Sequence, residues 1–116
     1  MFFIGSPKLT FLILIISYYY NMNQEYYTVD EINNYFKSPY NTLKKLISYN
    51  KISLDVIFNY ILPNLDELAQ DSEDSYVSTY DVLNKQPYWK GEYLNYYKNN
   101  HINNKILLNI INNLSK

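Results

Sequence analysis

The stretch TVDEINNYFKSPYNTLKKLISYN, residues 28–50, carries the signals of two successive helices. Thr28 followed by Glu31 is the pattern of a capping box, in which each side chain accepts a hydrogen bond from the other residue's backbone N–H. Apolar residues then recur at the i, i+3, i+4 spacing of a helix with one buried face, namely Ile32, Tyr35 and Phe36. The pattern therefore predicts a first helix directly after the threonine.

A second helix is predicted after a turn of two residues, Lys37 and Ser38. Serine is a favourable N-cap, and the fixed φ of Pro39 suits the first helical position. The same apolar spacing returns at Leu43, Leu46 and Ile47. We expect these side chains to pack on the first helix, and Asn50 to end the second helix in the left-handed conformation.

A polar stripe lies opposite the apolar face of this second helix. Its members are Tyr40, Asn41, Lys44, Lys45 and Ser48, with Lys37 and Lys51 at the two ends. A helix in the major groove of DNA needs side chains that hydrogen-bond to base edges, and cations that contact phosphates. Asparagine suits adenine, and lysine suits guanine or a phosphate oxygen. We therefore predict DNA contacts at these residues; the alternative is the solvated face of an ordinary helical hairpin.

Residues 28–53 resemble the helix-turn-helix of the excisionase and MerR-like DNA-binding families. Thr28 and Glu31 fall on the capping positions, residues 38–43 on the start of the recognition helix, and residues 50–52 on its closing step. The resemblance implies a DNA-binding regulatory or accessory protein. This chain has Lys37 where the families have a glycine, has no arginine on the recognition helix, and continues into another predicted helix instead of a basic β-wing.

The amino-acid composition limits the size of the fold and the kind of partner that the chain can attract. The chain has 116 residues, 47% of them hydrophobic and 18% charged, which suits one folded domain. Its net charge is −1 and all ten basic residues are lysines, so attraction to a polyanion must come from a local lysine cluster. The absence of arginine and the excess of tyrosine, asparagine and isoleucine are typical of an AT-rich genome, and we expect a viral or mobile-element origin.

The first 24 residues form an apolar N-terminal segment, whose hydrophobic run from Leu9 to Ile16 is shorter than the roughly 20 residues of a spanning helix. Three interpretations stay open at this point. The segment is a membrane anchor through residues 2–20, a buried element of the domain, or an extension upstream of a start at Met22. The expected location is accordingly cytoplasmic, with membrane association as the alternative.

The remainder, within a single domain over residues 25–116, is predicted to be helical. Ser53 is a candidate N-cap for a helix with an apolar stripe up to Pro63: Leu54, Ile57, Phe58, Ile61 and Leu62. A short helical turn at Leu65 and Leu68 should precede an acidic loop at 71–75, and Ser78 or Thr79 should cap the next helix. Trp89, Tyr93 and Tyr97 recur at four-residue steps and are predicted to be buried; single-strand stacking is the alternative.

The C-terminal stripe can pack in two ways. It comprises Ile106, Leu107, Ile110, Ile111 and Leu114, and either docks on the domain or forms a homodimer with the same helix of a second copy. A dimer would suit a DNA-binding protein, because two half-sites multiply affinity.

No enzyme and no cofactor or metal site is expected. His101 is the single histidine and should be exposed at a helix end, there is no cysteine, and the acidic loop lacks the glycine of a calcium loop. We therefore expect a small all-α bundle with a helix-turn-helix at 28–50 that binds DNA. The alternative is a protein-interaction or structural module, with a possible membrane tether.

Overall fold

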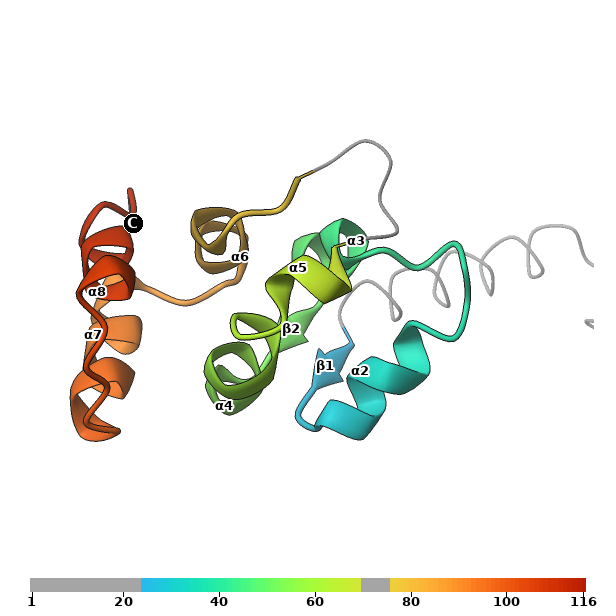
Figure 1. The fold of residues 1–116 in the computed structure, drawn as a ribbon, viewed down its shortest axis with the longest axis horizontal. Coiled ribbons are helices and arrows are strands. Elements are labelled where there is room, and N and C mark those ends of the chain that lie inside the picture. Colours follow the sequence, from blue (N-terminus) through green and yellow to red (C-terminus); the bar gives the residue numbers. More distant parts are fainter. Residues whose placement is uncertain (1–23, 70–75) are drawn as a thin grey trace, which may run out of the picture.

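The computed structural model describes residues 24–69 and 76–116, and this part of the chain is mostly helical (Figure 1). The elements in chain order are β1 (Glu25–Tyr26), α2 (Val29–Tyr35), α3 (Leu43–Tyr49), β2 (Lys51–Ile52), α4 (Leu54–Val56), the π-helical turn η2 (Ile57–Ile61), α5 (Leu65–Leu68), α6 (Thr79–Lys85), α7 (Lys90–Asn99) and α8 (Lys105–Asn112). The predictions for the apolar N-terminal segment and the acidic loop fall outside the described residues. Within them, no helix has the length and apolarity needed to cross a membrane.

The predicted capping box at the start of α2 is present. The Thr28 hydroxyl accepts the Glu31 backbone N–H at 3.1 Å, and the Glu31 carboxylate accepts the N–H groups of Tyr27 at 2.8 Å and Thr28 at 2.9 Å. These hydrogen bonds hold the pKa of the Glu31 carboxyl below its usual value, and the bond from the Tyr27 N–H has the largest effect. Ile32 is fully buried, so α2 begins and faces the core as the sequence predicts.

The predicted start of the second helix at Pro39 is wrong. α3 begins at Leu43, with the Thr42 hydroxyl accepting the Lys45 N–H at 3.3 Å. The cause lies in the preceding residues: the Asn41 side chain donates to the carbonyl of Tyr35 at 2.8 Å, near the end of α2. The connection therefore covers residues 36–42 and is longer than two residues.

The predicted left-handed end of this helix is also wrong. Asn50 is extended, with φ −134°, because the chain enters β2 at once. β2 pairs in parallel with β1, placing Glu25 opposite Lys51 and Tyr26 opposite Ile52. This small sheet, which the all-α prediction lacked, joins the two ends of the α2–α3 pair.

The helix predicted after Ser53 is confirmed, but its second part is a π-helical turn. The Ser53 hydroxyl caps α4, which continues into η2, where Leu62 N–H bonds to the Ile57 carbonyl at 2.9 Å. The buried side chains of this segment are Val56, Ile57, Phe58 and Ile61. They pack in one core with the apolar faces of α2 and α3, and the short turn predicted at Leu65 and Leu68 forms α5.

The C-terminal half stacks outward from this core in the order α6, then α7 with α8 (Figure 1). Ser78 caps α6 together with Asp81, as predicted. Tyr93 is fully buried, but Trp89 is 70% exposed, which contradicts its predicted burial. Trp89 occupies the N-cap of α7 and so precedes the helical face to which it was assigned. His101 is exposed just after α7, as predicted.

The C-terminal helix docks on its own domain. α8 contacts α6 and α7 and buries Ile111, with Leu114 buried just beyond its end. Ile106, at the other end of the predicted stripe, stays 77% exposed. The domain itself therefore buries only part of the predicted apolar stripe.

One buried polar side chain joins the two halves. Gln86, the C-cap of α6, is fully buried. Its amide nitrogen donates to the carbonyls of Ile47 at 2.9 Å and Asn50 at 2.8 Å, and its oxygen accepts the Ile52 N–H at 2.8 Å. One side chain thus holds α6 against the end of α3 and the start of β2.

Substitution of Thr42 by alanine should lower the free energy of unfolding by about 1 kcal/mol, the usual value of an N-cap. Ser38→Ala is the matched control, because Ser38 lies in the turn and not at the helix start. Chemical denaturation of both variants measures the difference. A larger loss of stability for Ser38→Ala than for Thr42→Ala would contradict the start of α3 at Leu43 and favour the predicted start at Pro39.

Stability should fall steeply at alkaline pH. Burial raises the pKa of the Tyr35 and Tyr88 phenols from 10.0 to about 12. Because the folded-state values are the higher ones, the stabilisation is complete below pH 10.0 and is lost as the pH rises towards 12. Melting temperatures measured by circular dichroism across this window should decline, and less so for Tyr35→Phe. A melting temperature that stays constant up to pH 12 would contradict the assignment.

Candidate nucleic-acid interface

The two central lysines of the predicted site lie in the first turn of α3. Lys44 and Lys45 directly follow Leu43, whose side chain is buried, and both are exposed. The Lys45 ammonium donates to the Tyr40 carbonyl at 3.0 Å, so it leans over the preceding connection. Lys44 instead borders a notch against α6. The two cations therefore flank the start of α3 on different sides.

The predicted single helical stripe is not formed, since Tyr40 and Asn41 belong to the connection before α3. Tyr40 is 79% exposed and is free to contact a ligand through its ring. Asn41 is half-buried and its amide nitrogen already donates to the Tyr35 carbonyl. Tyr40 thus remains a candidate contact residue, whereas Asn41 has a structural role that sequence spacing did not indicate.

The remaining predicted residues border this surface. Lys37 is exposed directly after the end of α2, and Ser48 is half-buried on α3. Lys51 is exposed on β2, with its ammonium 5.5 Å from the centre of the Tyr88 ring. Such a cation–π contact limits the positions the ammonium can take. Together with Lys44 and Lys45, these lysines give this part of the chain four exposed cations: one after α2, two in the first turn of α3 and one on β2.

A small notch lies between α3 and α6. It has a volume of about 220 Å³ and is lined by Lys44, Ile47, Tyr76, Val77, Asp81 and Lys85. Ile47 and Val77 are buried and form its apolar part, while Tyr76 is 84% exposed and both lysines are exposed. Lys85 and Tyr76 were not predicted as site residues, because only the packing of α6 on α3 brings them to Lys44.

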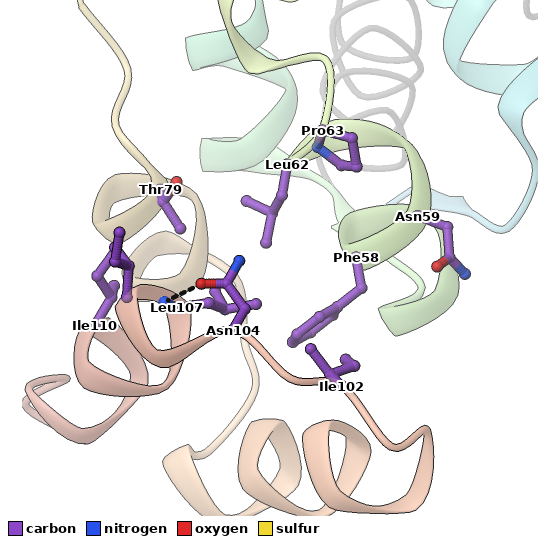
Figure 2. Close-up of a pocket in the computed structure, with 10 residues that line it drawn as sticks. Phe58, Asn59, Leu62, Pro63, Thr79, Ile102, Asn104, Leu107 and Ile110 are labelled. Atoms are coloured by element: carbon purple, nitrogen blue, oxygen red, sulfur yellow. Dashed lines mark hydrogen bonds between the residues drawn. The ribbon is translucent and has the colours of Figure 1, made fainter.

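A larger apolar groove opens on another part of the molecule, between η2, the start of α6 and α8 (Figure 2). Its volume is about 460 Å³, and it is lined by Phe58, Asn59, Leu62, Pro63, Thr79, Ile102, Asn104, Ile106, Leu107 and Ile110. None of these residues is charged. Asn104 faces the groove but its oxygen accepts the Leu107 N–H at 3.1 Å as the cap of α8. The groove therefore offers mainly apolar contact.

The described residues that line the groove and the notch include no histidine. Within residues 24–69 and 76–116, no group of three or more histidine, aspartate or glutamate side chains is placed to hold a metal ion. His101 is exposed beyond the end of α7, outside both cavities. Comparisons of the chain with protein-family models, curated proteins and solved structures gave no match.

Proposed function

We propose that this protein binds DNA through the α2–α3 pair, which acts as a helix-turn-helix. The observation that carries the proposal is the exposure of four lysines around α3, in a chain whose net charge is −1. Two of them, Lys44 and Lys45, stand in its first turn, where the residues of a recognition helix reach DNA. This cluster of four exposed lysines favours a local contact with a polyanion, on a chain whose other residues carry a net charge of −5.

Each residue of the cluster has a distinct role in this proposal. Lys45 and Tyr40 enter the groove together, because the lysine's bond to the Tyr40 carbonyl holds the connection against α3. Lys37, Lys44 and Lys51 neutralise phosphates beside the groove, and Ser48 lies at the margin. Asn41 acts indirectly by fixing the connection through its bond to Tyr35. The protein then serves as a non-enzymatic regulatory or accessory factor.

A salt series tests this proposal. Affinity for a labelled duplex of mixed sequence is measured by fluorescence anisotropy between low and physiological salt. Counterion release predicts that log K falls linearly with log salt, with a slope of about −0.9 for each neutralised phosphate. Three to four lysine contacts therefore predict a slope near −3. A slope close to zero, or no binding at low salt, would exclude the proposal.

A protein-interaction role is the second candidate, and the apolar groove favours it. Ile106 lines this groove and is also 77% exposed at its edge. A second copy of the chain, related by a two-fold axis, would insert each Ile106 into the other copy's groove, as isologous interfaces require. Because no lining residue is charged, the contact would bury no unpaired charge. Such a dimer is also compatible with DNA binding at two half-sites.

Ile106→Glu should convert the dimer to a monomer. The substitution places a charge where an apolar side chain would be desolvated, and the expected weakening is at least about tenfold in the dimer dissociation constant. Sedimentation equilibrium of both proteins measures it, with Lys105→Glu as the control that adds negative charge one residue earlier. A wild-type protein that stays monomeric at high concentration would contradict the dimer.

A further inference from the structure

We propose that the notch between α3 and α6 binds a backbone phosphate of the bound DNA, with Lys44 and Lys85 as its two cations. This inference rests on the proposed DNA binding and extends the interface beyond the helix pair. It assigns a flanking backbone contact to α6.

The first support is the position of the two lysines on different elements. Lys44 belongs to the first turn of α3, and Lys85 is the last residue of α6. Both line the same notch of about 220 Å³, above the buried side chains of Ile47 and Val77. Two ammonium groups on facing helices can contact one phosphate from two sides, which a single exposed lysine cannot do.

The second support is the rigidity of this pairing. The residue after Lys85 is Gln86, whose buried amide bonds to the carbonyls of Ile47 and Asn50 at 2.9 and 2.8 Å. The backbone that carries Lys85 is therefore tied directly to α3. Preorganisation of this kind lowers the cost of ordering a side chain on binding.

The third support is the charge of the notch. Among the described residues that line the notch, Asp81 is the one acidic side chain, and one of its carboxylate oxygens accepts both the backbone N–H and the hydroxyl of Ser78, at 3.0 and 2.9 Å. This carboxylate caps α6 and keeps its charge, so that with two lysines the described lining of the notch has a net charge of +1. Tyr76, 84% exposed at the margin, adds a hydroxyl donor and a ring next to the sugar–phosphate chain.

The salt dependence of duplex binding by Lys85→Ala tests the inference. Because Lys44 still contacts the shared phosphate, Lys85→Ala should weaken binding severalfold at low salt, and the double variant Lys44→Ala/Lys85→Ala, which leaves that phosphate without a cation, should reduce the magnitude of the slope by about 0.9. Lys98→Ala is the matched control, because Lys98 also lies exposed in the last turn of a helix, on α7. Lys85→Arg should retain the affinity, and circular dichroism verifies that each variant is folded.

The outcomes separate this inference from the function on which it rests. If the wild-type protein binds duplex and Lys44→Ala weakens it, but Lys85→Ala matches Lys98→Ala, the phosphate site is overturned and the helix-turn-helix proposal stands. If the wild-type protein shows no salt-dependent binding, both are overturned. If Lys85→Ala weakens binding relative to the Lys98 control, and the double variant with Lys44→Ala also lowers the slope, the site is supported.

Discussion

Replacement of Gln86 by leucine is expected to lower the free energy of unfolding by at least about 3 kcal/mol. The fully buried Gln86 side chain bonds to three backbone groups, the carbonyls of Ile47 and Asn50 and the N–H of Ile52. Leucine has a similar volume but cannot pair with any of them. Each backbone polar group that is left buried without a partner costs about 1–3 kcal/mol.

Urea denaturation followed by circular dichroism measures this loss, and Gln24→Leu is the control. Gln24 is exposed at the start of the sheet, so its substitution should change the free energy of unfolding by no more than about 0.5 kcal/mol. Equal stabilities of the two variants would contradict the role of Gln86 as the link between α6 and α3. Equal stabilities would also mean that Gln86 does not hold the backbone of Lys85 rigidly against α3.

The double substitution of Lys44 and Lys45 by alanine is expected to weaken duplex binding by at least about tenfold at low salt. Loss of two cations from the interface should also reduce the magnitude of the salt slope. Both side chains are exposed, and alanine has a higher helix propensity than lysine, so α3 should persist. Anisotropy titrations and circular dichroism on the same samples measure binding and helicity separately.

The double variant Lys98→Ala and Lys105→Ala is the matched control. It removes the same charge from α7 and α8, away from the helix pair, and should bind duplex with little change. If the two double variants lose affinity equally, binding depends only on net charge and the α3 surface has no special role.

Much of the local structure follows from sequence because its causes are local. The capping pairs at Thr28 and Ser78, the cap at Ser53 and the i, i+3, i+4 stripes depend on residues within one helical turn. The start of α3 was mispredicted because Ser38 and Thr42 are both good N-caps. The choice between them depends on the bond from Asn41 to the Tyr35 carbonyl, which joins two elements.

The candidate site was predictable only where it lies on one segment. Lys44 and Lys45 follow from the spacing of α3, but Lys85 and Tyr76 reach Lys44 through the packing of α6, more than thirty residues along the chain. A single sequence gives no signal for this contact. The buried role of Gln86 is equally hidden, since glutamine is usually exposed and its three partners are distant in sequence.

Chemical-shift mapping of the full-length, 15N-labelled protein with unlabelled duplex at low salt tests the central claim most directly. It locates the bound surface without requiring knowledge of the target sequence. We predict that the largest amide shift changes fall on residues 37–51, with a smaller set at 76–85. Changes concentrated on residues 58–63 and 102–110 around the apolar groove, or no changes on α3, would contradict DNA binding through the helix pair.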